Sequence, residues 1–253
     1  PLSVDENFAL PLPRIQDAIT TKTRGILINT PSNPTGMVVS KETLEEIARI
    51  ATEHDLIVIS DETYDRFLFE GEHVSIYTLP GMKERTFLVN SASKIFSMTG
   101  WRIGYVVAKA EYIPLLTKVH QNLSTCATSF AQVGAAIAYN ECDDFTDNMV
   151  SEFKLRRDRL IEGLLGIPGI ECTVPQGAFY LFPRITSTGM SSMEFCNLML
   201  DHGVAMVPGT AFGQDFEGYV RLCYACSLED IDWAISQMKK AIDEFNGRKK
   251  RNV

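Results

Sequence analysis

The chain has 253 residues, of which 45% are hydrophobic and 22% are charged, a composition typical of globular proteins. Its net charge is −8 at pH 7, which argues against nucleic-acid binding because that function needs a basic surface. No apolar run approaches the roughly 20 residues that a membrane-spanning helix requires. We therefore expect neither a nucleic acid nor a membrane as a partner.

The chain ends and the cysteines favour a cytoplasmic protein. Pro1–Glu6 has neither the basic start nor the apolar stretch of a secretory signal, and the basic tail Arg248–Arg251 is typical of a solvated end. The 6 cysteines are scattered, as expected of reduced thiols in a cytosolic protein. Cys223 and Cys226 form a single C-x-x-C pair, and no second pair or histidine pair lies nearby to predict a metal site.

The first half of the chain alternates between short apolar runs and a helical pattern. Ser40 can cap a helix whose apolar residues share one face, and Asp55 closes this helix. Short β-branched runs separated by helices favour an α/β fold with a largely parallel sheet and crossover helices. Strands are expected over residues 25–30, 56–60, 86–90 and 103–108.

The second half begins with helical patterns and then mixes short strands with helices. The last helix is expected to start at Ser227 and to stop at Gly247. The change near residue 145 predicts a larger α/β domain over 1–144 and a smaller α+β domain over 145–253. Helices are expected over 111–123, 129–140, 145–165 and 191–202, and strands over 178–182, 204–207 and 219–224.

A lysine among small hydroxyl residues follows the third expected strand, in Ser91-Ala92-Ser93-Lys94. A lysine amine can form a Schiff base with an aldehyde cofactor, and hydroxyls and an arginine are donors that a phosphate needs. A lone lysine is most often simply exposed. The whole segment, however, resembles the lysine signature of the class I aminotransferases, which use pyridoxal 5'-phosphate. The match holds at the small residues before Lys94 and at Gly100, Arg102 and Gly104.

The resemblance implies a role for each residue of this segment. Lys94 would form the Schiff base with the cofactor and then act as general base and acid for the proton shift. Ser91 and Arg102 would bind the phosphate, with Arg102 as the bidentate and permanently charged partner, and Ser93 would contribute to the same task. These roles make Lys94 a catalytic residue and the other three cofactor-binding residues.

Two earlier segments resemble further motifs of the same family. Residues 29–36 have the composition of a plain turn, but by resemblance the Asn33 amide donates to the phenolic oxygen of the cofactor and contacts substrate. The family often has a cis bond here, so we predict a cis Asn33–Pro34 peptide. Asp61 could simply cap a helix, whereas the resemblance implies that it holds a proton on the pyridine nitrogen. Tyr64 would hydrogen-bond the phenolic oxygen.

A fourth segment, residues 219–225, lies in the expected smaller domain. A single arginine on an alternating strand most often faces solvent. By resemblance, Arg221 instead clamps the α-carboxylate of the substrate through its planar fork. Residues 176–180 and 207–213 also resemble family segments, which line the mouth of the site.

Taken together, the resemblance implies fold type I of the pyridoxal-phosphate-dependent transferases, without the N-terminal third that the family usually carries. The implied reaction moves an amino group from an L-amino acid to a 2-oxo acid through Lys94, in a homodimer. Two alternatives stay open. One is a pyridoxal-phosphate-dependent carbon–sulfur β-lyase, which needs the same electron sink. The other is a catalytically inactive, truncated aminotransferase-like protein. The sequence does not identify the amino acid.

Overall fold

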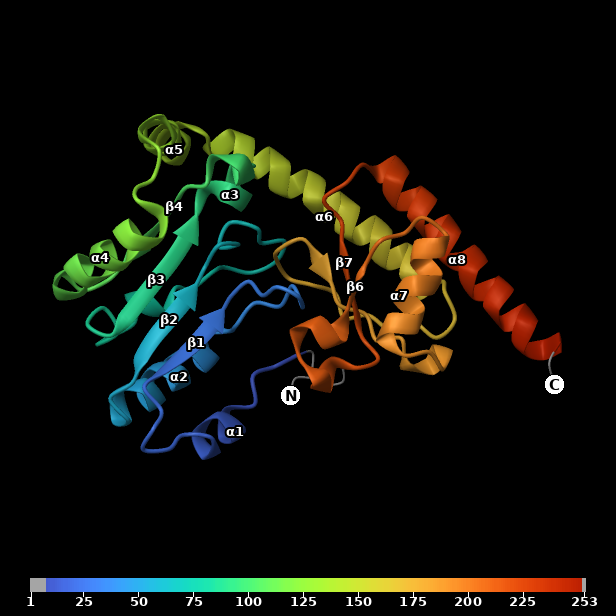
Figure 1. The fold of residues 1–253 in the computed structure, drawn as a ribbon, viewed down its shortest axis with the longest axis horizontal. Helices are drawn as coiled ribbons and strands as arrows, with labels where there is room; N and C mark the ends of the chain where they lie inside the picture. The colour runs from blue at the N-terminus through green and yellow to red at the C-terminus, as the bar shows by residue number, and fades with distance from the viewer. Residues whose placement is uncertain (1–7, 252–253) are drawn as a thin grey trace. The chain divides into compact units, whose positions relative to one another are not determined.

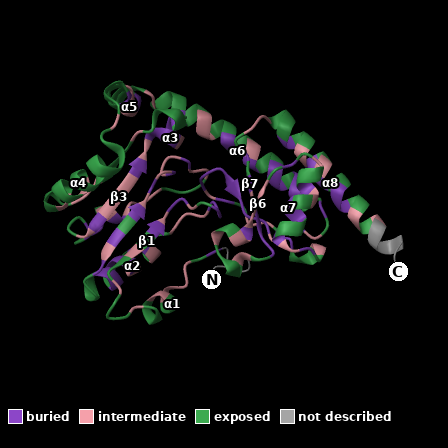
Figure 2. Ribbon diagram, in the orientation of Figure 1, coloured by how far each residue is buried: buried purple, intermediate pink, exposed green. Residues whose placement is uncertain are grey.

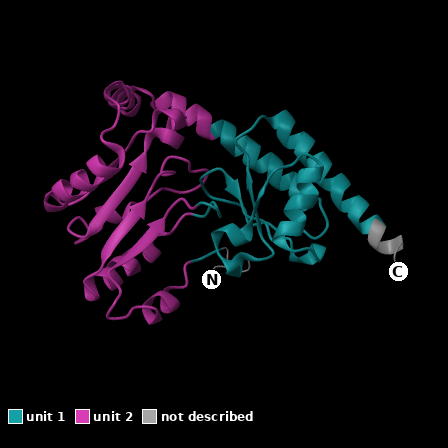
Figure 3. Ribbon diagram, in the orientation of Figure 1, with its two compact units in different colours: residues 1–9, 33–37, 151–253 teal, residues 10–32, 38–150 magenta. Residues whose placement is uncertain are grey.

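The computed structural model describes residues 8–251, and these residues group into two units (Figure 3). Of the described residues, unit 1 comprises 8–9, 33–37 and 151–251, and unit 2 comprises 10–32 and 38–150. The predictions made for the opening segment 1–6 and for the side chains of the basic tail 248–251 lie outside the described residues.

Unit 2 is built on a four-stranded sheet in the order β1-β2-β3-β4 (Figure 1). The first three strands are parallel, and β4 runs antiparallel to β3. The predicted largely parallel sheet is confirmed, and the four predicted runs match the strands closely. The strands are β1 (Gly25–Asn29), β2 (Ile57–Asp61), β3 (Thr86–Ser91) and β4 (Gly104–Val107).

One face of this sheet, which we call the helix face, is covered by α2 (Lys41–Glu53). The helix begins because the Ser40 side chain accepts the N–H of Thr43, as predicted for its cap. It ends before Asp55, which has a left-handed φ of 50°. Each buried Leu or Ile contributes about 1.5–3 kcal/mol to folding. The core between helix and sheet includes Leu44, Ile47, Ala48, Ala51, Ile28 and Val58.

The opposite face, which we call the open face, includes exposed apolar residues. Exposed parts of the chain are green in Figure 2. Leu27 pairs with Ile59 across β1 and β2, and these side chains are 69% and 41% exposed. Val106 on β4, which pairs with Val89, is 40% exposed. Parallel sheets normally have both faces covered. Among the described residues, this sheet is therefore covered well on one face only.

Of the remaining helices of unit 2, α4, α5 and α6 correspond to the helices predicted over 111–123, 129–140 and 145–165, whereas the shorter helices were not predicted. α3 packs against α5 through Ala92, Ile95, Phe96, Ala135 and Ala138. None of the described helices is both long and apolar enough to cross a membrane. The helices are α1 (Leu12–Asp17), η2 (Ile76–Thr78), α3 (Ala92–Ile95), η3 (Thr99–Trp101), η4 (Ala110–Tyr112), α4 (Ile113–Ser124), α5 (Ser129–Glu141) and α6 (Asp143–Leu165), whose later part belongs to unit 1.

Unit 1 contains an antiparallel sheet of three short strands in the order β5-β7-β6. Its strands are shorter than predicted. Residues 204–206 are not strand, because the N–H of Val204 bonds to the carbonyl of Met199 in the turn that ends a helix. Ala178 has a left-handed φ of 55°, which delays the start of the next strand. The strands are β5 (Tyr180–Leu181), β6 (Val207–Pro208) and β7 (Val220–Cys223).

Two helices of unit 1 begin at the predicted caps. Ser191 and Glu194 form a reciprocal capping box, and the Ser227 hydroxyl accepts the N–H of Asp230 at 3.1 Å. The prediction that Gly247 stops the last helix is wrong. The helix runs through Gly247, since a glycine ends a helix only where it adopts a left-handed conformation. The helices are η5 (Thr186–Thr188), α7 (Ser192–Asp201), η6 (Gly209–Phe212), η7 (Gln214–Phe216) and α8 (Leu228–Arg251).

The two faces of the sheet can be distinguished by lysine substitutions at neighbouring positions of β1. We expect Leu27→Lys to change the free energy of unfolding by less than about 0.5 kcal/mol and to reduce self-association, because Leu27 lies on the open face. We expect Ile28→Lys to lower the free energy of unfolding by more than about 3 kcal/mol, because it buries a charge. Urea unfolding and light scattering measure both effects. Equal destabilisation by the two changes would contradict the assigned faces.

Candidate active site

The carboxyl ends of the parallel strands bring two of the predicted residues to one edge of the unit 2 sheet. Asn29 at the end of β1 pairs with Asp61 at the end of β2, and Asp61 pairs with Val89 in β3. Ser91 lies two residues beyond Val89 and therefore on the same face. This is the open face. Asp61 and Ser91 thus lie on one face at one edge, where ligands bind in open α/β sheets.

The Asp61 carboxylate is held by Thr63, two residues further along the loop. Its Oδ1 accepts the backbone N–H of Thr63 at 3.2 Å and the Thr63 hydroxyl at 2.7 Å. The backbone carbonyl of Asp61 accepts the N–H of Thr30 at 3.1 Å. Among the described residues, no donor is bonded to Oδ2, which leaves this oxygen as an acceptor toward a ligand. The sequence did not single out Thr63, although a hydroxyl two residues after an aspartate is a common turn partner.

The loop that carries Tyr64 is held by Glu62, a buried acidic residue two positions before the tyrosine. Glu62 is buried, and its Oε1 accepts from the Ser60 hydroxyl at 2.7 Å and from the Ser75 hydroxyl at 2.8 Å. Its Oε2 lies 2.9 Å from His73 Nε2. Tyr64 is only 5% exposed, and its ring lies 6.3 Å from the ring of Phe67 in an edge arrangement. The loop that carries Asp61 and Tyr64 is thus held in place by the hydrogen bonds of Glu62 and by the ring contact of Tyr64 with Phe67.

Ser91, Ser93 and Lys94 lie in one short turn at the end of β3. The Ser91 Oγ accepts the N–H of Ser93 at 3.1 Å and caps α3, in which Lys94 is the third residue. The two hydroxyl oxygens are 2.8 Å apart, and the Ser91 hydroxyl also lies 3.2 Å from the carbonyl of Ile103. A hydroxyl has one hydrogen, so Ser91 can donate to only one of these at a time. When Ser91 donates to Ile103, the Ser93 hydroxyl can donate to Ser91 or outward.

Arg102 follows in the connection to β4. It adopts a left-handed φ of 53°, is exposed, and donates to the carbonyl of Thr99 at 3.1 Å. Gly104 comes next in the predicted signature and pairs with Ser91. A Cβ at position 104 would lie 2.7 Å from the carbonyl oxygen of Asn90, so only glycine fits without a shift. The glycine therefore allows β4 to approach the strand end that carries Ser91.

In unit 1 the structure joins two other predicted residues. Arg221 of β7 donates from Nη1 to Asn33 Oδ1 at 3.0 Å. The Arg221 guanidinium carbon lies 4.7 Å from the ring centroid of Tyr180 and 5.1 Å from that of Phe212. Such cation–π contacts contribute about 0.5–2 kcal/mol each and fix the plane of the guanidinium. Arg221 is half-buried in this setting and is not a simple solvent-facing arginine.

The two aromatic residues come from segments that the sequence had only placed at the mouth of a site. Tyr180 belongs to the segment 176–180, and Phe212 to the segment 207–213. Sequence spacing gave no sign that these rings hold an arginine, because their contact depends on the pairing of β5, β7 and β6. The Arg221 Nε is buried and has no hydrogen-bond partner among the described residues.

Asn33 belongs to a segment that packs within unit 1. The predicted cis Asn33–Pro34 peptide is confirmed, and Thr30–Pro31 is also cis. Gly36 has a φ of +70°, and its carbonyl accepts the N–H of Gly177 at 2.9 Å. A Cβ on Gly36 would lie 2.9 Å from the carbonyl oxygen of Tyr180. Glycine at this position lets the Asn33 segment pack against the chain that carries Tyr180.

A buried pair that the sequence missed lies behind the Ser91 turn. Asn90 Nδ2 donates to Asp65 Oδ2 at 2.8 Å, and Asn90 Oδ1 accepts the N–H of Ser91 at 2.6 Å. Asp65 Oδ1 is buried without a hydrogen-bond partner among the described residues, an arrangement that costs about 1–3 kcal/mol. Burial raises the pKa of Asp65, and the hydrogen bond from Asn90 opposes this rise. A polar residue at the end of an apolar strand was the available signal for Asn90.

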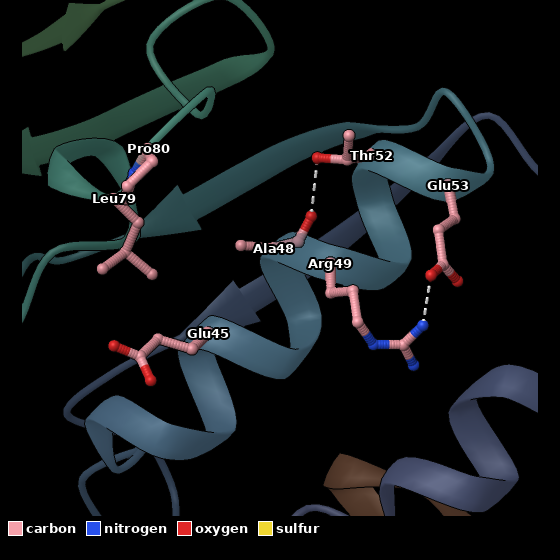
Figure 4. Close-up of a pocket in the computed structure, with 7 residues that line it drawn as sticks. All are labelled: Glu45, Ala48, Arg49, Thr52, Glu53, Leu79 and Pro80. Atoms are coloured by element: carbon pink, nitrogen blue, oxygen red, sulfur yellow. Dashed lines mark hydrogen bonds and ion pairs between the residues drawn. The ribbon is translucent and has the colours of Figure 1, made fainter.

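A surface hollow beside α2 contains none of the candidate residues (Figure 4). An ion pair between Arg49 and Glu53 and a hydrogen bond from the Thr52 hydroxyl to the Ala48 carbonyl lie along its wall. Its charged groups are already paired along the helix, so we assign no function to it.

Comparisons with known proteins identify the fold and then the family. An aromatic aminotransferase from Pyrococcus horikoshii superposes with a TM-score of 0.94 at 42% identity, over 97% of this chain and 67% of that protein. An aspartate aminotransferase from Thermus thermophilus, solved with maleate, gives a TM-score of 0.90 at 36% identity, over 95% of this chain and 62% of that protein. The fold is therefore fold type I of the pyridoxal-phosphate-dependent transferases.

The sequence profile of aminotransferase class I and II matches residues 1–238. An aspartate aminotransferase from Pyrococcus abyssi is 44% identical over 248 residues, which are 96% of this chain and 64% of that protein. The chain belongs to the class I and II aminotransferase family. It spans about two thirds of the length of the curated relatives that it matches.

The two glycines of the lysine signature give a matched test of the site geometry. We expect Gly104→Ala to lower the free energy of unfolding by about 1–3 kcal/mol, because its Cβ would approach the Asn90 carbonyl oxygen. We expect Gly100→Ala to change it by less than about 1 kcal/mol, because no atom lies within 4 Å of its Cβ position. Thermal and urea unfolding measure the difference. Equal effects would show that β4 does not approach Ser91 as described.

The buried carboxyl of Asp65 predicts a specific pH dependence. Between the ordinary pKa of 3.8 and the raised pKa, the folded chain keeps a proton that the unfolded chain has lost. The contribution of Asp65 to stability is thus complete below pH 3.8 and is lost as the pH rises through the raised pKa. Asp65→Asn lacks this titration. We expect its free energy of unfolding, relative to the parent, to increase as the pH rises and then to level off.

Urea unfolding of the parent and of Asp65→Asn from about pH 3 to about pH 7 measures this difference. Subtracting the two series removes the contributions of acidic residues that are distant from Asp65. Glu62 and His73 interact with Asp65, so their contributions stay in the difference. A flat difference, or one that falls with rising pH, would mean that the carboxyl is not held in the buried setting described.

Proposed function

We propose that this chain provides the chemistry of a pyridoxal-phosphate-dependent aminotransferase, which moves an amino group from an L-amino acid to a 2-oxo acid. The observation that carries the proposal is the shared edge of the unit 2 sheet, where Asp61 lies on one face with Ser91, which caps the short helix containing Lys94. Family membership supports the same reaction, since relatives named as aspartate and aromatic aminotransferases match nearly the whole chain.

The residues present at this edge fit pyridoxal 5'-phosphate by the chemistry of their donors and acceptors. Ser91, Ser93 and Arg102 would hold the phosphate, since hydroxyls and a guanidinium donate to its oxygens. Asp61 would accept from the protonated pyridine nitrogen through Oδ2, the oxygen with no described donor. When bound, the cofactor supplies an electron-withdrawing ring that stabilises negative charge on the substrate Cα.

Each proposed catalytic residue acts on a stated atom. Lys94 would hold the cofactor through Nζ and would carry the proton at the substrate Cα as general base and acid. Tyr64 would donate its hydroxyl hydrogen to the phenolic oxygen, and its buried ring fixes the position of that hydroxyl. Asp61 would keep the pyridine nitrogen protonated, because an ionised carboxylate stabilises a nearby cation.

The proposed substrate contacts belong to unit 1. Arg221 would bind the α-carboxylate, and the two aromatic rings that flank its guanidinium would preserve the planar orientation needed for two parallel hydrogen bonds. Asn33 would serve the phenolic oxygen and the substrate through Nδ2, since its Oδ1 already accepts from Arg221. Both assignments rest on the family resemblance together with the contact between the two residues.

Further parts of the proposal concern the whole protein. We propose a cofactor-binding domain over 1–144, a smaller domain over 145–253, a homodimer and a cytoplasmic location. The substrates would be amino acids and 2-oxo acids, in keeping with relatives named for aspartate and for aromatic amino acids. Transamination is preferred to carbon–sulfur β-elimination because those relatives are named as aminotransferases.

Replacement of Lys94 tests the proposal directly. We expect the parent chain with added pyridoxal phosphate to develop a new absorbance band and to transfer an amino group to 2-oxoglutarate. Lys94→Ala should abolish the band and slow transfer by at least about a hundredfold, because the amine and the proton carrier are both lost. A suitable control is Lys109→Ala, since Lys109 pairs with Glu84 and Glu111 and has no proposed role.

Two other results would favour an alternative to the aminotransferase hypothesis. Release of pyruvate from cystathionine, without amino transfer, would favour the β-lyase. A folded parent chain that takes up no pyridoxal phosphate would favour the inactive, truncated protein. Loss of the band in Lys109→Ala as strongly as in Lys94→Ala would contradict the role of Lys94.

A further inference from the structure

We propose that Asp65 and Asn90 are positioning residues that hold the Ser91–Lys94 turn in a fixed place relative to the Asp61–Tyr64 loop. The inference rests on the proposed function, because it explains how two groups of proposed cofactor-binding residues within unit 2 are aligned. Neither residue is a catalytic residue in this proposal. Both act through the backbone and side chains of their neighbours.

The backbone at Ser91 lies beyond the last pair that β3 forms with β2. The pairing of β2 with β3 ends at Asp61 and Val89, and Ser91 lies two residues beyond this last pair. Its N–H is donated to the Oδ1 of Asn90 at 2.6 Å. The Asn90 side chain is 3% exposed, so water does not compete freely for this bond. Asn90 therefore fixes the backbone at the point where β3 gives way to the lysine turn.

The Asn90 amide is oriented in turn by Asp65. A side-chain amide that accepts through Oδ1 must donate through Nδ2, and an ionised carboxylate can only accept. Asn90 Nδ2 donates to Asp65 Oδ2 at 2.8 Å, which selects the amide orientation that Ser91 requires. The N–H of Asp65 bonds to the carbonyl of Glu62 at 3.0 Å, within the loop that contains Asp61 and Tyr64. The pair thus connects the loop after β2 with the turn after β3.

The connection continues to the neighbour of Lys94. Ser91 Oγ accepts the N–H of Ser93 at 3.1 Å, and Ser93 directly precedes the lysine. One continuous path of hydrogen bonds therefore runs from Asp65 through Asn90 and Ser91 to Ser93. A shift of the loop after β2 would be transmitted to the proposed phosphate-binding hydroxyls along this path.

The position of Asn90 separates it from the candidate ligand-binding residues Asp61 and Ser91. Asn90 pairs with Tyr105, whereas Ser91 pairs with Gly104, so the two side chains leave β3 on opposite faces. Asn90 lies on the helix face, and Ser91 and Asp61 lie on the open face. A ligand held by the open-face residues would not touch Asn90.

The Asp65–Asn90 pair also has a feature that lowers the stability of the fold. Asp65 Oδ1 is buried and has no hydrogen-bond partner among the described residues. Apolar residues of similar volume would avoid this penalty, and local arrangements that reduce stability are expected mainly where function requires them. The Asp65–Asn90 pair matches that expectation because its one evident consequence is the placement of Ser91.

Amide hydrogen exchange tests the positioning role without any cofactor. We expect the peptide that covers residues 91–97 to exchange about tenfold faster in Asn90→Ala and in Asp65→Ala than in the parent. Asp65→Asn keeps an acceptor oxygen and should restore slow exchange. Arg85→Ala is the control, because Arg85 bonds to the carbonyls of Ala51 and Leu56 just before β3, at the opposite edge of the same sheet.

Covalent labelling measures the consequence for the lysine. The whole chain is mixed with pyridoxal phosphate and reduced with borohydride, and the label on Lys94 is quantified by mass spectrometry. We expect the labelling rate to fall about tenfold in Asn90→Ala and Asp65→Ala, to recover in Asp65→Asn, and to remain unchanged in Arg85→Ala. If Asn90→Ala does not fold, the two Asp65 variants decide the result.

The outcomes separate this inference from the proposed function. Exchange of residues 91–97 at the parent rate in Asn90→Ala or Asp65→Ala overturns the positioning role. Faster exchange with unchanged labelling overturns its importance for the lysine. A parent chain that is never labelled counts against the proposed function, and the exchange result then still decides whether the pair fixes the turn.

Discussion

The parallel pairing of β1, β2 and β3 is the constraint on which the candidate site of unit 2 depends. Because the strands run in the same direction, their carboxyl ends reach a common edge, and the observed register places Asp61 beside Asn29 and Val89. A slip of one residue in β3 would move Ser91 to the helix face and Asn90 to the open face. Burial opposes such a slip, since it would move Thr86 and Asn90, the two buried residues of β3, off the helix face.

The sequence predicted the sheet well because its strands are short β-branched runs and its first helix has a clear serine cap. It also predicted that Asp61 and Ser91 would lie at the carboxyl edge of the sheet, since each comes directly after an apolar run. It failed where tertiary contacts decide the outcome. Residues 204–206 bond to the preceding helix and do not pair, and α8 continues through Gly247. The partners Asp65 and Asn90 were missed because their contact joins a loop residue to a strand residue 25 positions away in sequence.

In unit 1, the contacts described above fix the orientation of a planar cation, the guanidinium of Arg221. Arg221 is held by two aromatic rings and by the Asn33 amide, so its guanidinium cannot rotate freely. A lysine at this position would keep the charge but lose the planar fork and the stacking. Tyr180 comes from β5, on one side of the central strand β7, and Phe212 comes from η6, which directly follows β6 on the other side. The small sheet is therefore the element that assembles this environment.

The open face has a thermodynamic consequence for any ligand at the sheet edge. Asp61 and Ser91 lie on the same face as the exposed side chains of Leu27, Ile59 and Val106. A polypeptide that covered these apolar residues would also exclude water from the edge and strengthen the hydrogen bonds formed there. Binding of such a polypeptide and binding of a ligand at the edge would then be coupled. Each would raise the affinity of the chain for the other by the same factor.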